Sequence, residues 1–474
     1  MSVTLDEIAR RSLVIAGFGV EGRDLYRYLR TRFPDKGLAI AEAQPLDAEA
    51  QALIAGDRHV VAHVGGDHLN HLGDYEIVFR SPGIPLAHPA IQGARARGAQ
   101  VMSQTALFLA LCQRPVIGVT GTKGKSTTTA LIHAILAAAG REPYLVGNIG
   151  PDLGGESPLL TLERATGRAV FVYELSSFQL EGLEVSPDIA VLLDVVPEHL
   201  DHHASFDTYL GAKENITRFQ RPRDWLVYDA TSGAASAVAG RTRAQTMPCR
   251  VDGPVDRGVF VEDGARVVFA AAFGRENIID VADVARTLPG RFNLRNVLPA
   301  VAVARILSIE TAAIVRGITG FRPLRDRFEE VGTFRGVTFY NAAIATVPEA
   351  TIAHLETLAP RVGSVILGGV DRGADYTALA RRILADGVAA VILFPDTGAR
   401  IREAMEKEAG TRRLPQCVHV TGMEEAVRAA FDVTPSGSIC LHSPASPSRG
   451  GLWKSYADRG AEFRAWVTRL GASG

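Results

Sequence analysis

Residues 116–129 read VIGVTGTKGKSTTT, and this stretch decides the fold of the chain. It joins a short β-branched apolar run to a glycine-rich turn and then to an apolar run typical of a helix, the pattern of a parallel α/β unit. Backbone amides of such a turn can bind phosphate oxygens, Lys125 can reach the terminal phosphates, and the Ser126 hydroxyl can hold Mg²⁺. Val119 stands where the strict phosphate-loop pattern has Gly, so the turn is a variant. The predicted ATP-binding residues of the turn are Gly121, Thr122, Lys123, Gly124, Lys125, Ser126 and Thr127.

Similar apolar runs that end in glycine-rich turns recur along the 474 residues, for example LVIAGFG at 13–19 and VILGGV at 365–370. This alternation predicts an α/β protein with mainly parallel sheets, whose ligands bind at the carboxyl ends of the strands. New series of strands, turns and helices start after residue 105 and after residue 321. We therefore expect three domains: 1–105, Rossmann-like; 106–321, a central ATPase of phosphate-loop type; and 322–474, Rossmann-like.

Composition excludes several classes of function. The chain has 51 Lys and Arg against 52 Asp and Glu, a formal net charge of -1, so neither a nucleic acid nor a membrane surface is an expected partner. The four cysteines stand singly, which argues against both a disulfide framework and a zinc site and favours the cytoplasm. The apolar run at 12–19 is too short to span a bilayer.

A second glycine loop, GFGVEG at 17–22, lies near the N-terminus, and Glu42 ends the next predicted strand. This pattern matches the dinucleotide fingerprint and would suit a nicotinamide-dependent oxidoreductase. The same loop can bind any diphosphate, and we favour a UDP-sugar over a dinucleotide or a plain tight turn. The loop RSPGIP at 80–85 should face the same crevice. The predicted UDP-sugar residues here are Gly19, Val20, Glu42, Ser81, Pro82 and Gly83.

Four further motifs follow in order: GNIG at 147–150, ELSSFQL at 174–180, PEHLDHH at 197–203, and Lys213. With the loop at 120–127 they resemble the Mur ligase family, the ATP-dependent amino-acid-adding enzymes of peptidoglycan precursor synthesis, and the resemblance covers nearly the whole chain. ELSSFQL is similar to the branch that adds glutamate to UDP-N-acetylmuramoyl-L-alanine. The resemblance implies roles in cell-wall biogenesis, cell shape and cell division. We expect the chain to act as a monomer.

The resemblance also implies site roles. Lys125 neutralises the transferred phosphoryl group, Ser126, Glu174 and His199 help bind two Mg²⁺ ions, and Lys213 is carbamylated so that it too serves a metal. The substrate-facing residues implied are Asn148, Ser176 and Gln179.

Without the family, these positions have plainer interpretations. Glu174 ends a strand, where a glutamate is usually solvated, and Lys213 suits a solvated helix face. His199, His202 and His203 have the i, i+3, i+4 spacing of one helix face and could pass for zinc ligands, but the sequence supplies neither a cysteine nor a fourth ligand nearby. His202 and His203 are therefore left without a role.

The segment GRFNLRN at 290–296 is similar to the family motif that meets adenine, with Phe292 in the place of a histidine. Asn293 and Asn296 could bind the base, or could cap a helix instead. Arg327 matches the family arginine that lies over the nucleotide, and its charge suits phosphate oxygens. The break at 321–323 is the expected hinge for domain closure.

The third block departs from the D-glutamate-adding pattern. Residues 341–347 read NAAIATV where that branch has N-D-S-K-A-T-N, so Ala342, Ala343 and Ile344 replace Asp, Ser and Lys. Losing a lysine beside a substrate carboxylate calls for other cations, and the pattern resembles the sub-branch that adds L-glutamate. We therefore favour L-glutamate, with D-glutamate as the alternative. The predicted amino-acid-binding residues are Thr346, Arg372, Ser448 and Tyr456, with Arg449 and Lys454 as further cations.

Two more alternatives remain. A related ligase that acts on folate or another acceptor would share the central loop but would not need a UDP-binding first domain. A non-catalytic binding descendant is suggested by Ala342 and Ala343.

Overall fold

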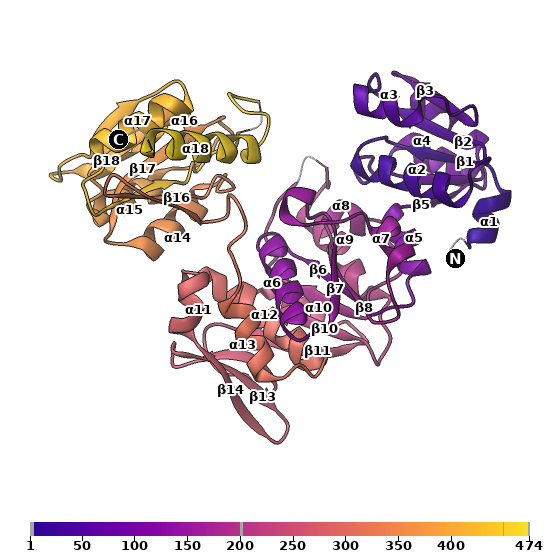
Figure 1. Ribbon diagram of the computed structural model, residues 1–474, viewed down its shortest axis with the longest axis horizontal. Coiled ribbons are helices and arrows are strands. Elements are labelled where there is room, and N and C mark those ends of the chain that lie inside the picture. Colours follow the sequence, from indigo (N-terminus) through magenta and orange to yellow (C-terminus); the bar gives the residue numbers. More distant parts are fainter. Residues whose placement is uncertain (1–3, 200–201, 449, 473–474) are drawn as a thin grey trace. The chain divides into compact units, whose positions relative to one another are not determined.

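The computed structural model describes residues 4–199, 202–448 and 450–472 (Figure 1). Contacts divide the chain into two compact units: Met1–Val284 with Leu294–Phe321, and Ala285–Asn293 with Arg322–Gly474. Within the described residues the strands form three sheets, in successive parts of the sequence. The prediction of an α/β fold with mainly parallel sheets is therefore confirmed. The longer segment of the second unit begins at Arg322, next to the predicted break. Its shorter segment, 285–293, lies within the block that the sequence assigned to the centre of the chain.

The first sheet has the order β3-β2-β1-β4-β5 and is parallel throughout. Leu13 and Ile15 of β1 pack with α2, whereas Val14 and Ala16 pack with η1 and α4 on the other face. Alternate residues thus serve opposite faces of a sheet that is covered on both sides. Its elements are α1 (Leu5–Arg10), β1 (Leu13–Ala16), α2 (Val20–Arg32), β2 (Leu38–Glu42), α3 (Ala48–Ile54), β3 (Val60–Val64), η1 (His68–Asp74), β4 (Ile77–Arg80), α4 (Pro89–Ala96), β5 (Gln100–Met102) and α5 (Gln104–Leu111).

The second sheet has the order β14-β13-β12-β11-β10-β9-β6-β8-β7. Its strands are parallel except for β13, which runs antiparallel to both β12 and β14. Strand β6 lies between β8 and β9, so the glycine-rich turn that follows β6 stands beside the ends of two buried strands. The elements before the antiparallel part are β6 (Val116–Thr120), α6 (Lys125–Ala138), β7 (Glu142–Gly147), η2 (Pro151–Leu153), α7 (Pro158–Arg164), β8 (Ala169–Glu174), α8 (Ser177–Leu180), β9 (Ile189–Leu192), α9 (Phe206–Arg218), β10 (Trp225–Asp229), α10 (Gly233–Ala239) and β11 (Gln245–Arg250).

The remaining elements up to the predicted break at 321 complete this sheet and add helices. They are β12 (Gly258–Glu262), β13 (Arg266–Ala271), β14 (Gly274–Asp280), α11 (Val281–Thr287), α12 (Arg291–Ile306) and α13 (Thr311–Thr319). Residues 225–280 thus contain the strands β10 to β14.

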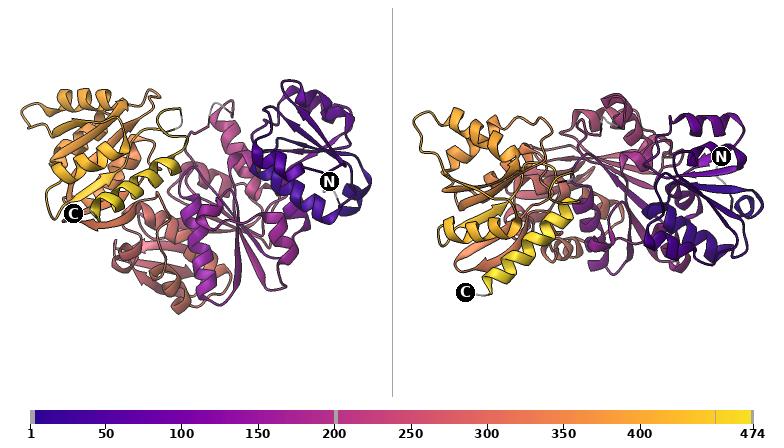
Figure 2. Two further views of the ribbon diagram at one scale, coloured as in Figure 1. Left: turned by 45° about the horizontal axis from the view of Figure 1, so that its top comes forward. Right: turned by 90° about the horizontal axis from the view of Figure 1, so that it is seen from above.

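The third sheet, order β15-β16-β20-β17-β18-β19, is parallel except for β15. Val365 and Leu367 of β17 pack with α14 to α16, whereas Ile366 packs with α17 and α18, so helices cover both faces (Figure 2). Its elements are β15 (Glu329–Phe334), β16 (Val337–Asn341), α14 (Pro348–Leu358), β17 (Val362–Gly369), α15 (Thr377–Asp386), β18 (Ala390–Asp396), α16 (Thr397–Ala409), β19 (Gln416–His419), α17 (Met423–Val433), β20 (Ile439–His442) and α18 (Tyr456–Gly471).

Among the described residues, no helix combines the length and the apolar character needed to cross a membrane. The four cysteines are free thiols.

Candidate active site

The turn after β6 has the geometry of a phosphate-binding loop. Gly121 and Gly124 have φ values of 154° and 84°, and Gly124 is the N-cap of α6. A Cβ atom at Gly124 would lie 2.3 Å from Oδ1 of Asn296, so the loop admits glycine alone without rearrangement. The Nζ atom of Lys125 donates to the carbonyl oxygens of Gly121 (3.1 Å) and Thr122 (3.0 Å). The lysine therefore lies over the loop that a phosphate would occupy.

Glu174 lies at the end of β8, next to β6. Its side chain is buried, contrary to the solvated position usual for a glutamate at a strand end. Nδ2 of Asn148 donates to its Oε1 at 2.9 Å, whereas its Oε2 is buried and has no hydrogen-bond partner among the described residues. A buried carboxylate oxygen without a partner is costly, and a cation or a donor from a ligand would satisfy it.

Lys213 of α9 is also buried, with 1% of its surface exposed. Nζ donates to the carbonyl oxygen of Gly121 at 2.9 Å and to Oγ1 of Thr120 at 3.2 Å, both neutral acceptors. Burial, together with the nearby charge of Lys125, holds the pKa of Lys213 well below its ordinary value, against the opposing effects of Glu198 and Glu174. The solvated helix face that the local sequence suggests for Lys213 is therefore wrong.

The described histidines of this motif, His199, His202 and His203, lie outside helix α9. His199, 202 and 203 lie in the irregular segment before α9, and Leu200 and Asp201 of this motif lie outside the described residues. His199 is exposed and has a φ of 56°, with Nε2 4.0 Å from Oε2 of Glu198. His203 is buried, with Nε2 3.1 Å from Oγ of Ser177, and His202 lies beside Glu181. All three histidine rings contact Phe178.

The two candidate UDP-sugar loops of the first sheet are adjacent. Oγ of Ser81 donates to the carbonyl oxygen of Gly17 at 2.8 Å, and a Cβ atom at Gly17 would come within 2.7 Å of Ser81. Oε2 of Glu42 accepts a hydrogen bond from the amide of Phe18 at 2.7 Å, so this carboxylate supports the loop. Gly19 caps α2, and Val20 is 77% exposed. Pro82 and Gly83 continue the second loop.

Gln179 is buried, and its amide group is already engaged. Nε2 donates to Oε1 of Glu21 at 2.6 Å, and Oε1 accepts from the amide of Ser176 at 2.8 Å in a capping box. Burial raises the pKa of Glu21 to about 7, despite the opposing effects of Gln179 and Arg80. The hydrogen bond between Gln179 and Glu21 connects the ELSSFQL motif to the first glycine loop.

Three loops of the second unit follow the neighbouring strands β16, β20 and β17, and they carry the predicted amino-acid-binding residues. Ala342 and Ala343 are fully buried, whereas Ile344 and Thr346 are half-buried. Ser448 is buried, and Arg372 and Lys454 are exposed. Arg449 lies outside the described residues.

Arg459 of α18 connects two of these loops. It is fully buried, donates to the carbonyl oxygen of Ala343 at 2.8 Å, and donates to that of Ser446 at 3.1 and 3.2 Å. Burial lowers its pKa to about 10. Nothing in its local sequence marks Arg459 as different from a surface arginine of a helix.

Asn293 and Asn296, both predicted to bind the nucleotide, belong to different units and contact different residues. Nδ2 of Asn293 donates to the carbonyl oxygen of Pro289 at 2.7 Å, and Asn296 accepts from Oγ1 of Thr128 at 3.3 Å. Phe292 packs against Phe328 and His354.

Arg327 lies close to Tyr456 within the second unit. Its Cζ is 5.9 Å from the centre of the Tyr456 ring, and Nη2 lies 3.4 Å from the hydroxyl. A residue predicted to bind nucleotide and one predicted to bind the amino acid are therefore neighbours.

Sequence reasoning missed the connection between Arg80 and Glu181. Arg80 is buried at the end of β4, and Nη1 lies 3.0 Å from Oε2 of Glu181, which also accepts from the amide of Leu86 at 3.1 Å. A charged residue at the end of an apolar strand is a signal for a buried pair, but the sequence does not say which carboxylate it meets.

Comparisons with known proteins cover all three parts of the chain. Residues 11–103 match the MurD-like N-terminal domain of Mur ligases, 119–304 the Mur ligase middle domain, and 326–446 the glutamate ligase domain of Mur ligases. A UDP-N-acetylmuramoylalanine--D-glutamate ligase of Symbiobacterium thermophilum is 37% identical and covers 96% of this chain and 97% of its own. A Streptococcus pneumoniae protein of the same name is 30% identical, and the match covers 98% of this chain and 99% of that protein.

A likeness in fold extends to more distant proteins. The crystal structure of UDP-N-acetylmuramate-alanine ligase from Thermotoga maritima is 17% identical, covers 98% of this chain and 100% of its own, and has a TM-score of 0.61. The two sequence relatives are named for D-glutamate, so the comparisons agree with the D-glutamate alternative and give no support to the L-glutamate preference. The chain belongs to the Mur ligase family, whose members are ATP-dependent acid–amino-acid ligases.

Proposed function

We propose that this protein joins glutamate to UDP-N-acetylmuramoyl-L-alanine in peptidoglycan precursor synthesis, with conversion of ATP to ADP and phosphate. The names of the relatives support this acceptor, and the match of 11–103 to a MurD-like N-terminal domain favours it over folate. The observation that carries the proposal is the arrangement at the ends of β6 and β8. There a phosphate-type loop and a buried carboxylate with an unpartnered oxygen follow neighbouring strands, and a buried lysine of α9 contacts the loop.

The residues of this region fit a nucleotide and Mg²⁺. The positive φ values of Gly121 and Gly124 shape a loop of backbone amides at the start of α6, and Ser126 stands in the first turn of that helix. The unpartnered Oε2 of Glu174 fits a hard cation that takes oxygen ligands. Ser126, Glu174, His199 and Lys213 are the residues proposed to hold Mg²⁺, which when bound neutralises charge on phosphoryl oxygens.

In the proposed reaction, a carboxylate oxygen of the alanyl group attacks the γ-phosphorus of ATP, and ADP leaves. The amine of glutamate then attacks the resulting acyl phosphate, forms a tetrahedral intermediate and expels phosphate. Lys125 moves from the carbonyl oxygens of its own loop to the transferred phosphoryl group, where its charge stabilises the transition state. Asn148 keeps the Glu174 carboxylate oriented.

Lys213 is proposed to be carbamylated. A neutral amine nitrogen attacks the carbon of CO₂ and loses a proton, which leaves a carbamate anion. Burial supports this step, because it holds the pKa of Lys213 well below the ordinary range and so favours the neutral amine. The neutral acceptors of Nζ do not oppose the loss of charge.

The first glycine loop is proposed to bind the UDP part of the acceptor, with Ser81, Pro82 and Gly83 on its neighbouring loop. The hydrogen bond between Ser81 and Gly17 supports a common site. Because the chain belongs to a ligase family, we do not propose a dinucleotide as the ligand of this loop.

D-Glutamate is the amino acid proposed first, from the names of the relatives. L-Glutamate is the second candidate, favoured by Ile344 at the position where the D-glutamate branch has lysine. Phosphate release should be measured with UDP-N-acetylmuramoyl-L-alanine, ATP and Mg²⁺, and with each enantiomer separately. Release with D-glutamate alone removes the L-glutamate candidate, release with L-glutamate alone reverses the order, and release with neither overturns the proposed function.

A further inference from the structure

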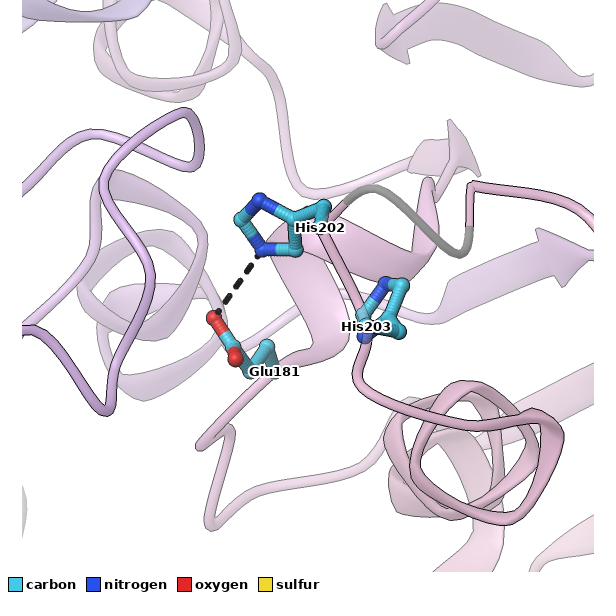
Figure 3. Close-up of side chains that lie close together, drawn as sticks. All are labelled: Glu181, His202 and His203. Atoms are coloured by element: carbon cyan, nitrogen blue, oxygen red, sulfur yellow. Dashed lines mark ion pairs between the residues drawn. The ribbon is translucent and has the colours of Figure 1, made fainter.

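A pocket of about 410 Å³ in the first unit lies apart from the phosphate loop. Its lining includes Pro85 and Ala87, which follow β4, and residues of α9. It also includes Glu181, His202 and His203, whose side chains gather there (Figure 3). One nitrogen or oxygen from each of these three lies within 4.8 Å of the others.

Two atoms of the pocket lining are buried without a hydrogen-bond partner in the described part of the chain: Nε2 of His202 and Oδ1 of Asn215. Nδ2 of Asn215 donates to the carbonyl oxygen of Leu180 at 2.9 Å, which fixes the amide with its oxygen as the unsatisfied atom. Oδ1 of Asn215 carries lone pairs, as does Nε2 of His202 in the tautomer protonated at Nδ1, and unsatisfied buried polar atoms are uncommon in folded proteins. An electron-pair acceptor, such as a cation, would satisfy both.

The kind of cation follows from the ligand types. Imidazole nitrogens with one carboxylate suit borderline ions such as Zn²⁺, Co²⁺ and Ni²⁺, whereas Mg²⁺ prefers oxygen ligands alone. Nε2 of His202 and Oε2 of Glu181 are 3.6 Å apart. The imidazole and the carboxylate are therefore near enough to share one ion, since two ligands of a tetrahedral zinc ion with bonds of about 2.1 Å lie ~3.4 Å apart. His203 is the third candidate, with a ring nitrogen within 4.8 Å of the ligand atoms of the other two; its Nε2 lies 3.1 Å from Oγ of Ser177.

Arg80 modifies the site without blocking it. Its guanidinium and the amide of Leu86 both contact Oε2 of Glu181, which takes up the lone-pair positions of that oxygen and leaves Oε1 as the ligand atom for an ion. Partial neutralisation of Glu181 by Arg80 makes the imidazoles the main ligands. This again favours a borderline ion over Mg²⁺.

We propose that Glu181, His202 and His203, with Asn215 as a further oxygen ligand, form a binding site for one borderline divalent transition-metal ion such as Zn²⁺. Its ligands are different residues from those proposed for Mg²⁺, which are Ser126, Glu174, His199 and Lys213. A bound ion would connect the residue that follows α8 to the turn before α9. It would therefore stabilise the fold instead of replacing Mg²⁺ in the reaction.

The test uses the full chain without an affinity tag, with Co²⁺ as the probe and Mg²⁺ in large excess to occupy oxygen-rich sites. Equilibrium dialysis should show one equivalent of Co²⁺ retained, with a d–d absorption band that Zn²⁺ abolishes. The melting temperature should rise with Zn²⁺, because the ion binds the folded state. His202→Phe keeps a ring against Phe178 and should lower Co²⁺ affinity at least tenfold, on the order of the loss for disturbed metal sites.

His203→Phe is the second variant, and far-ultraviolet circular dichroism without metal establishes that each variant is folded. His199→Asn is the matched control, because this histidine lies in the same segment but outside the pocket, and it should retain the Co²⁺ band. Absence of a retained equivalent under excess Mg²⁺ overturns the proposal. So does a band that His199→Asn abolishes and folded His202→Phe and His203→Phe leave intact. Neither result bears on ligase activity, so the proposed function is judged separately.

Discussion

The Nζ atom of Lys213 lies 2.9 Å from the carbonyl oxygen of Gly121, so a lysine of α9 directly contacts the phosphate-type loop after β6. The contact joins residues 92 positions apart, and it removes the lysine from solvent. A buried amine with neutral acceptors is an unusual environment for a lysine, since burial without a counterion disfavours its charged form.

Lys213→Met should leave the fold intact and lower phosphate release by on the order of 10²–10³-fold, the loss typical of one electrostatic contact to a transition state. Methionine fills a similar apolar volume, so the melting temperature should not fall by much. With ¹³C-labelled bicarbonate, a carbamate resonance should be present in the parent protein and absent in the variant. Lys407→Met on α16 is the control, and full activity of Lys213→Met would contradict the assigned role.

Glu174→Gln removes the negative charge of the side chain and keeps its shape, so it tests whether the charge is needed. Glutamine can still accept the hydrogen bond from Asn148, so stability should be unchanged or slightly higher once the unpartnered carboxylate oxygen is gone. Activity should fall by on the order of 10²–10³-fold and recover in part at high Mg²⁺. Glu142→Gln, on the neighbouring strand β7, should behave as the parent protein. A Mg²⁺ dependence identical to that of the parent would rule out a metal role for Glu174.

Glu21→Gln should change how stability depends on pH. Burial raises the pKa of Glu21 from 4.5 to about 7, so the folded state holds this proton more tightly than the unfolded chain does. Its contribution to stability is greatest below pH 4.5, falls as the pH rises towards 7, and stays lost above 7. The free energy of unfolding of the variant should therefore rise relative to that of the parent as the pH rises, by up to about 3 kcal/mol. Melting temperatures at pH 5 and pH 8 measure this gain, and parallel curves would contradict it.

Arg80→Ala should destabilise the first unit by about 3–5 kcal/mol, because it leaves the partly buried carboxylate of Glu181 without its cation. The exposed pair Arg428 and Glu424 on α17 is the matched control, and Arg428→Ala should cost less than about 0.5 kcal/mol. Urea unfolding followed by circular dichroism compares the two. Equal losses would show that the Arg80 pair is no stronger than a surface pair.

Ile344→Lys should raise the use of D-glutamate relative to L-glutamate if the residue at 344 helps select the enantiomer. The side chain is half-buried, so a lysine can keep its amine at the surface of the loop. A cation facing the substrate carboxylate typically changes binding by about 2–5 kcal/mol, which is a large change in KM. The ratio of kcat/KM for the two enantiomers is the measurement, and a ratio equal to that of the parent would exclude the position from selection.

The sequence by itself determined the α/β class, the phosphate-type loop at 120–126, the glycine loop at 17–22 and the strand that ends at Glu42. These features are local: apolar periodicity, glycine at positive φ and a helix start all lie within a few residues of one another. The motifs also indicated the family, because each motif is a short sequence pattern and their order along the chain can be seen without a structure.

The tertiary structure alone decided which of these residues are buried and which meet. Lys213 has the local pattern of a solvated helix face, yet the sheet brings Gly121 over it. Glu181 meets Arg80 across 101 positions, and His202, which precedes α9, meets Glu181, which follows α8. Periodicity describes neighbours three or four residues apart, whereas these contacts depend on strand order and on how helices pack against the sheets.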